Sequence, residues 1–177
     1  MMNTPRFVLM LFLLALASAR PCHAEFSKQQ VKSAYVLNFL KFVEWPAKTF
    51  RVGDKIRLCV IGDDGLHAAL AEFDGRKVGE HFLQVMSHTG SDGLSVCHVL
   101  YIGEHQRRRA IAIIKSLGNA PILTVSDMPA FAERGGGIGL LHGDDRMLFE
   151  VNLASTRKAG LRLSGQMLNL SANIFGK

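Results

Sequence analysis

The stretch Pro121–Leu170 reads PILTVSDMPAFAERGGGIGLLHGDDRMLFEVNLASTRKAGLRLSGQMLNL, and it says more about the fold than the rest of the 177 residues. The apolar run Ile122–Val125 is typical of a buried strand. A glycine run at Gly135–Gly137 follows, and then a pattern that predicts a hairpin turning at Gly143–Asp145. The stretch closes on an amphipathic segment that predicts a helix.

Upstream of this stretch, strand patterns alternate with helical ones. A capping box, Ser27 with Gln30, opens a predicted helix that continues through VKSAYVLNFLKFVEW and ends at Pro46. The other predicted strands cover 56–61, 82–87 and 94–102, and the other predicted helices cover 66–73 and 106–117. Such alternation is typical of a parallel sheet covered on both faces. We therefore expect an α/β fold: a single Rossmann-like domain with a mostly parallel sheet, helices on both faces and a late antiparallel hairpin.

Residues 1–24 have the layout of a secretory signal peptide. The apolar run Phe7–Ser18 is too short for the ~20 residues that span a membrane, and the small residue Ala24 marks the expected cleavage site. Cys22 would allow lipidation, but the residues just before it do not fit the small-residue pattern that lipidation needs. We therefore expect export to the periplasm as a soluble protein, with residues 25–177 forming one domain.

The mature domain is mildly basic and mixed in sign. Cleavage removes Arg6 and Arg20, so 19 basic side chains face 15 acidic ones and the net charge is +4. A nucleic-acid partner would need a concentrated basic stripe, so none is expected. The run Arg107–Arg109 is most simply a solvated helix face, and a contact with an acidic partner is the alternative.

Two cysteines, Cys59 and Cys97, remain after cleavage. Both lie in apolar, strand-like runs rich in β-branched residues. An even count in an oxidising compartment favours a structural disulfide, which would stabilise the fold by roughly 3–4 kcal/mol in the chain-entropy model. The alternative is a pair of reduced core cysteines. We expect His98 to point to the other face of its strand, away from Cys97.

No pattern in the sequence predicts an active site. The segment Gly135–Gly139 lacks the spacing of a dinucleotide-binding loop and leads into a strand, where a helix N-terminus would be needed. The mature histidines show no metal-binding spacing with one another or with a cysteine. We therefore predict that the protein is not an enzyme and that it has no catalytic residue, metal or cofactor.

Two polar pairs follow predicted strands, where ligands of parallel sheets often bind. For Ser126–Asp127 the simpler interpretation is a loop in which Asp127 caps the next segment before Pro129. Asp63–Asp64 is a weak candidate cation site, because no further carboxylate lies nearby in the sequence. A pocket at Ser126–Asp127 would favour one alternative function, that of a periplasmic small-ligand receptor reporting to a membrane sensor kinase.

Two features suit contact with another protein. The first predicted helix is apolar nearly all round, and its aromatic residues Phe39, Phe42 and Trp45 exceed what one core-facing side needs. The alternative is a helix sandwiched between two layers of the domain. In the strand FEVNL, Glu150 and Asn152 point to the face opposite Phe149, where they either hydrogen-bond locally or meet a partner.

Seven segments in order carry a family resemblance: FLKFVEWP, LCVIGDD, CHVLYIG, PILTVSD, GGGI, FEVNL and GLRLSGQMLNL. Together they cover nearly the whole mature chain. Because these segments occur in this order and the cysteines match, the chain resembles the YfiR family of periplasmic proteins that restrain a membrane-bound diguanylate cyclase.

The resemblance implies a repressor that binds the periplasmic sensing domain of an inner-membrane diguanylate cyclase and so controls cyclic di-GMP and biofilm formation. It implies release by a further envelope protein, at the outer membrane, or by redox stress, and it leaves a homodimer open. Cys59 and Cys97 would form the fold-stabilising disulfide. Glu150 and Arg162, the latter in the family's terminal helix, would be candidates for the regulatory surface.

Some members of the family carry a second cysteine pair around the glycine-rich segment. This chain has Ala132 and Gly139 there. We therefore expect no second disulfide that could sense redox stress.

Overall fold

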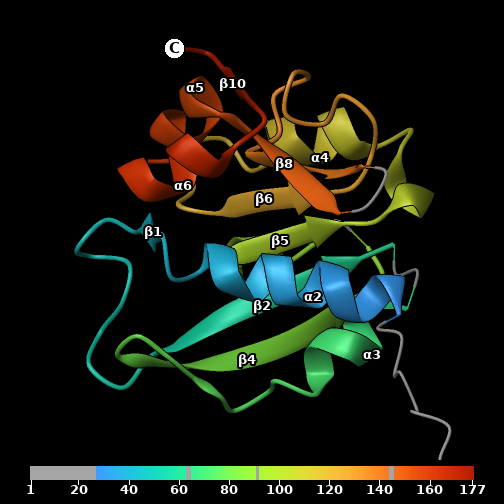
Figure 1. The fold of residues 1–177 in the computed structure, drawn as a ribbon. Helices are drawn as coiled ribbons and strands as arrows, with labels where there is room; N and C mark the ends of the chain where they lie inside the picture. The colour runs from blue at the N-terminus through green and yellow to red at the C-terminus, as the bar shows by residue number, and fades with distance from the viewer. Residues whose placement is uncertain (1–26, 63–64, 91, 144–145) are drawn as a thin grey trace, which may run out of the picture.

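A computed structural model describes residues 27–62, 65–90, 92–143 and 146–177 (Figure 1). The predicted signal peptide with Cys22, the Asp63–Asp64 pair and the tip of the predicted turn at Gly143–Asp145 lie outside the described residues. No helix among the described residues is long and apolar enough to cross a membrane.

An eight-stranded sheet in the order β10-β8-β7-β6-β5-β2-β4-β3 forms the centre of the fold (Figure 1). Five neighbouring strands of this sheet are parallel: β2 (Lys55–Ile61), β4 (His81–His88), β5 (Val99–Ile102), β6 (Leu123–Ser126) and β7 (Ile138–His142). Of these, β5 and β6 are buried at every position and β2 is buried from Leu58 onwards, which explains their nearly continuous apolar sequences, whereas β4 is mostly half-buried.

The outer strands complete the sheet. β8 (Met147–Asn152) pairs antiparallel with β7 and β3 (Lys77–Val78) pairs antiparallel with β4, whereas β10 (Asn173–Phe175) is parallel to β8. The mostly parallel sheet and the late antiparallel hairpin are thus confirmed.

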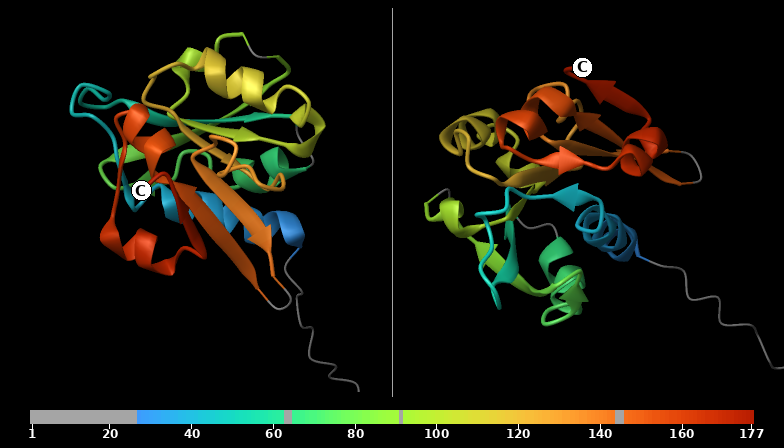
Figure 2. Two further views of the ribbon diagram at one scale, coloured as in Figure 1. Left: turned by 90° about the horizontal axis from the view of Figure 1, so that it is seen from above. Right: turned by 90° about the vertical axis from the view of Figure 1, so that its left-hand side faces the viewer.

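Helices cover both faces, as predicted. On one face, α2 (Lys28–Phe39) and α3 (Leu66–Ala71) pack on a large apolar cluster that includes Leu58, Val125 and Phe149. On the other, α4 (Ala110–Ser116) covers a smaller cluster around the two cysteines. Figure 2 shows the strands lying between α2 and α4. The capping box of Ser27 and Gln30 opens α2 as expected.

The predicted helices are shorter in the structure. The first ends at Phe39, and the chain then turns into β1 (Val43–Glu44), so Phe42 and Trp45 do not lie on a helix. The cause is tertiary pairing: β1 pairs with β9 (Arg162–Leu163), which satisfies backbone groups that a continued helix would have used.

The same pairing corrects the predicted closing helix. The segment holds two short helices, α5 (Leu153–Lys158) and α6 (Gly165–Leu170), with β9 between them. Gly160 ends the first one at φ +71°, a conformation that favours glycine. Arg162 therefore lies on a strand. Similarly, the predicted helix from Gln106 is a 3₁₀ turn (Glu104–Gln106) followed by α4.

Candidate functional site

The small sheet of β1 and β9 holds Arg162, one of the predicted partner-binding residues, and Trp45 directly follows β1. Glu44 pairs in register with Arg162, and the Arg162 guanidinium Nη2 lies 2.8 Å from Glu44 Oε2. Both side chains are highly exposed, at 82% for Arg162 and 65% for Glu44. An exposed pair of this kind stabilises the fold by about 0–1 kcal/mol, so most of its charge remains available to a partner.

A groove of about 730 Å³ lies beside this pair, and we call it the Trp45 groove. Its walls include Trp45, Phe50 and His81, with the two rings of Trp45 and Phe50 packed edge to face at 5.8 Å. Val52 lies fully exposed in its lining. Charged residues (Lys41, Glu44, Arg51 and Glu80) also line it. Apolar side chains together with charged ones are the usual composition of a protein-binding surface.

The other two predicted aromatic residues serve the domain itself. Phe39 is buried and packs on Phe149 with ring centroids 5.1 Å apart, and Phe42 is partly buried against the same core. Tyr35 donates a hydrogen bond of 2.6 Å from its hydroxyl to the Met147 carbonyl. Trp45 is likewise partly buried against this core, so a direct partner contact stays a prediction for all three aromatic residues, and Arg162 is the exposed candidate.

Glu150 and Asn152 are also interior, at 5% and 8% exposure. Asn152 caps α5 by accepting from the Ser155 N–H at 2.8 Å, and its amide donates to the Ala132 carbonyl at 2.7 Å. Glu150 lies over Gly139, and its Oε1 is buried without a hydrogen-bond partner among the described residues. Their predicted role at a partner surface stays a prediction.

Asp127, at the carboxyl end of β6, is held from two sides. Its Oδ2 lies 2.6 Å from Lys32 Nζ in a nearly buried ion pair, and Tyr101 donates to Oδ1 at 2.7 Å. Burial alone would raise the pKa of Asp127, but the hydrogen bonds from Lys32 and Tyr101 outweigh it and hold the pKa below its usual value. The carboxylate therefore joins α2 to the sheet and is engaged internally.

Ser126 takes the capping role predicted for Asp127. Its hydroxyl donates to the Ile102 carbonyl at 2.6 Å and accepts from the Met128 N–H at 3.1 Å. With both side chains of Ser126–Asp127 engaged, the two residues that would line the alternative ligand pocket are occupied by internal contacts.

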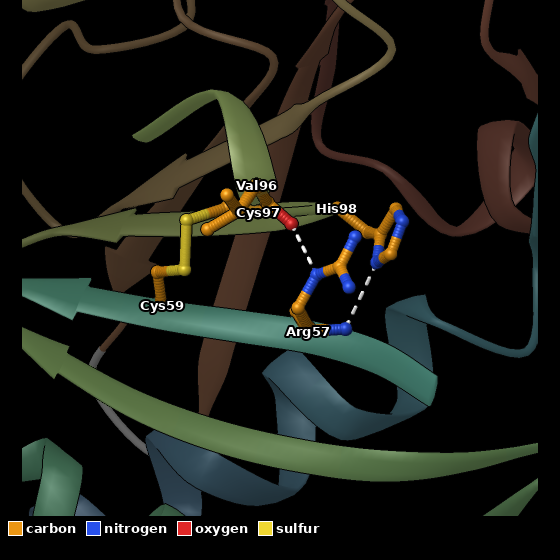
Figure 3. Close-up of a disulfide and its surroundings, with 5 residues drawn as sticks. All are labelled: Arg57, Cys59, Val96, Cys97 and His98. Atoms are coloured by element: carbon orange, nitrogen blue, oxygen red, sulfur yellow. Dashed lines mark hydrogen bonds between the residues drawn. A yellow bond between two sulfur atoms is a disulfide. The ribbon is translucent and has the colours of Figure 1, made fainter. Parts of the chain in front are cut away.

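The predicted disulfide is confirmed: Cys59 and Cys97 are bonded, with Cα atoms 5.9 Å apart (Figure 3). Cys59 lies on β2 and Cys97 on the turn that follows a short 3₁₀ helix (Leu94–Val96), just before β5. The sequence had predicted Cys97 within a strand that begins at Leu94. The bond closes one face of the sheet over the smaller apolar cluster.

His98 points away from the disulfide, as predicted (Figure 3). Its Nδ1 accepts from the Arg57 backbone N–H at 2.9 Å, which leaves the proton of the neutral ring on Nε2, and its ring packs on Phe50. Burial, followed by the nearby Arg57 charge, lowers the pKa of His98 to about 4. The ring is therefore neutral near pH 7, and its contacts with Arg57 and Phe50 serve the fold.

His88 lies near the disulfide, which the sequence analysis did not anticipate. A ring nitrogen of His88 and the two sulfurs of Cys59 and Cys97 lie within 4.8 Å of one another. His88 ends β4, and its register partner on β2 is Ile61. Spacing along the chain could not reveal this neighbour, because strand pairing alone brings β4 to β2.

A model of the YfiR/HmsC-like family matches residues 29–172 of the chain. Among solved structures, the chain is similar to a conserved domain protein from Vibrio cholerae O1 biovar eltor, with a TM-score of 0.60 and 10% identity over 85% of this chain. The match covers 61% of that protein, so the chain spans about three fifths of its length. At this identity the likeness shows the fold alone.

A weaker likeness is found to the ABC domain, in complex with L-Trp, from Streptococcus pneumonia. Its TM-score is 0.49 at 5% identity, over 67% of this chain and 55% of that one.

Proposed function

The chain belongs to the YfiR/HmsC-like family of periplasmic regulators of diguanylate cyclase signalling, and we propose that it represses an inner-membrane diguanylate cyclase by binding the cyclase's periplasmic sensing domain. The observation that carries this proposal is the family match over residues 29–172, nearly the whole predicted mature domain. The mechanism is occupancy: the bound repressor favours an inactive conformation of the sensing domain, and its removal shifts the population to the active one.

The Trp45 groove with the Glu44–Arg162 pair is the surface that we assign to the cyclase. This surface combines aromatic side chains, the exposed apolar residue Val52 and several charged residues. Aromatic residues and arginine dominate the binding energy of protein interfaces, which favours Trp45 and Arg162 as the main contacts. A releasing protein of the outer membrane would compete for the same surface.

The proposed function is tested by measuring the intracellular level of cyclic di-GMP in a strain that lacks the gene. We expect a rise over the parent strain, reversed by complementation with the wild-type gene. No rise, with the protein shown to be present in the parent, contradicts the proposal. Binding of the purified mature protein to the periplasmic domain of each inner-membrane cyclase, measured by calorimetry, then identifies the partner.

Charge reversal tests the surface. Arg162→Glu should raise cyclic di-GMP towards the level of the deletion strain while leaving protein abundance unchanged. Arg134→Glu makes the same charge change on an exposed residue in the loop between β6 and β7 and should repress normally. The swap Glu44→Arg with Arg162→Glu restores the internal pair: rescued repression would mean that the pair only stabilises the fold, and continued loss would support a partner contact.

A further inference from the structure

A histidine lies against the Cys59–Cys97 disulfide. His88 Nε2 is buried and has no hydrogen-bond partner among the described residues. A ring nitrogen of His88 and the two sulfurs lie within 4.8 Å of one another. The three residues come from separate places in the chain, the middle of β2, the end of β4 and the turn before β5, so only the tertiary fold collects them.

We propose that Cys59, Cys97 and His88 form a binding site for a thiophilic divalent cation, Zn²⁺ in the first instance, once the disulfide is reduced. Two thiolates and an imidazole are the ligands that zinc prefers, and water would fill the fourth tetrahedral position. Two sulfurs bound to one zinc at about 2.3 Å each lie at most about 4.6 Å apart. After reduction, the two sulfur atoms need to move apart only slightly to reach such positions. This inference goes beyond the proposed repressor function and does not depend on it.

The reduction and the binding are separate steps. A dithiol reductant supplies two electrons and two protons: its own thiols join in a disulfide while the bond between Cys59 and Cys97 breaks and leaves two thiols. Zn²⁺ then displaces the two thiol protons to solvent and takes both thiolates. The neutral imidazole of His88 donates one nitrogen lone pair, with no proton transferred.

Reduction leaves Cys97 close to Cys59, because other bonds hold the turn of Cys97 on β2. The Arg57 backbone donates to His98 Nδ1 at 2.9 Å, and its carbonyl accepts from the His98 N–H at 2.8 Å. The Arg57 guanidinium also donates to the Val96 carbonyl (Figure 3). These three bonds flank Cys97 on both sides, so the ligand atoms stay near one another when the covalent bond is absent.

The site gives the domain two alternative cross-links at one place. The oxidised protein is cross-linked by the disulfide, whose sulfurs have no thiolate to offer a metal. The reduced protein is cross-linked by the metal, which joins β2, β4 and the turn before β5. A reduced domain would therefore keep its fold where zinc is present and lose stability where it is chelated.

The test uses the mature chain, reduced with dithiothreitol, exchanged into anaerobic buffer and titrated with Zn²⁺, with Co²⁺ as the spectroscopic probe. We expect one metal ion per reduced wild-type chain, with thiolate-to-cobalt charge-transfer absorption, and none bound by the oxidised chain. His88→Ala should weaken Zn²⁺ binding by roughly 100-fold or more, since even a group supporting a ligand costs up to that factor. His142→Ala is the matched control, an exposed histidine on β7, from which β6, β5 and β2 separate β4.

Circular dichroism of the reduced chain covers the case in which reduction unfolds it. Zn²⁺ should then restore the fold of wild type and His142→Ala but not of His88→Ala. The proposal is overturned if reduced wild type binds no metal, if Zn²⁺ fails to restore a lost fold, or if His88→Ala binds as tightly as His142→Ala.

Discussion

Glu150 covers Gly139 on the neighbouring strand. The two are register partners on β8 and β7, and a Cβ on Gly139 would lie 3.0 Å from both Cγ and Oε1 of Glu150. The space above Gly139 is filled by a buried carboxylate. Gly139 is thus required by a side chain on the next strand, and its own φ gives no reason for glycine.

Gly139→Ala should lower the free energy of unfolding by about 1 kcal/mol, the lower end of the cost of overpacking. The added methyl group must displace the Glu150 side chain, which is buried and has little room to move. Urea unfolding followed by circular dichroism measures the loss. In a Glu150→Ala background the penalty should vanish, because the colliding atoms are gone.

Glu150→Gln is the matched control for this cycle. It keeps the volume of the side chain and removes only the charge, so Gly139→Ala should remain costly in that background. An equal penalty in the Gln and Ala backgrounds would show that the contact between Glu150 and Gly139 does not set the requirement for glycine.

Replacing one partner of the Lys32–Asp127 ion pair should lower the free energy of unfolding more than replacing both partners would suggest. Lys32→Met or Asp127→Asn alone leaves one charge buried without its partner and should cost about 3 kcal/mol. The double variant should cost clearly less than the sum of the two, because no buried charge is left. Additive losses in urea unfolding would contradict this coupling.

His98 should make the stability of the fold depend on pH. Its pKa is lowered to about 4 in the folded protein, against 6.5 for the free side chain, so between these values the unfolded chain binds more protons. The contribution of His98 to the free energy of unfolding is therefore fully present above pH 6.5 and is lost as the pH falls towards 4. We expect a loss of about 1–2 kcal/mol across this window, reduced from the full shift because the Arg57 charge is screened by solvent.

His98→Gln is the variant that checks this assignment. A glutamine can still accept from the Arg57 N–H but does not titrate, so the difference in stability between pH 7 and pH 4.5 should shrink relative to wild type. An unchanged pH dependence, measured by urea unfolding at both pH values, would assign the effect to other groups.

Cys59→Ser should lower stability and periplasmic abundance together. The disulfide joins residues 38 apart in sequence, and its loss costs roughly 3–4 kcal/mol in the chain-entropy model. The measurement is urea unfolding with a chelator present, together with immunoblots of the periplasmic fraction. A variant as stable and as abundant as wild type would show that the bond is unimportant.

Local patterns in the sequence were sufficient for most of the fold. The nearly continuous apolar runs of β2, β5 and β6 predicted buried parallel strands, because only strands covered on both faces need apolar residues at every position. The capping box of Ser27 and Gln30 predicted the start of α2, since its hydrogen bonds form within four residues. The two cysteines and the expected compartment predicted the disulfide.

Where the prediction failed, a distant segment had intervened. The helical pattern after Phe39 continues to Trp45, yet Val43 and Glu44 leave the helix to pair with Leu163 and Arg162. Helix propensity differs by less than about 1 kcal/mol between most residues, so such pairing readily overrides it. The same pairing divided the closing helix and placed Arg162 beside Glu44.

The candidate site residues likewise fall into those that local sequence patterns identified and those that only the tertiary structure placed. The sequence by itself determined the α/β class, the succession of strands and helices along the chain and the cysteine pair, because local patterns and the number of cysteines set each of them. Only the tertiary structure decided that Glu150 and Asn152 are interior, that Trp45 borders a groove, and that His88 faces the disulfide. Those facts depend on which strands lie side by side, and strand pairing is set by contacts between residues far apart in the chain.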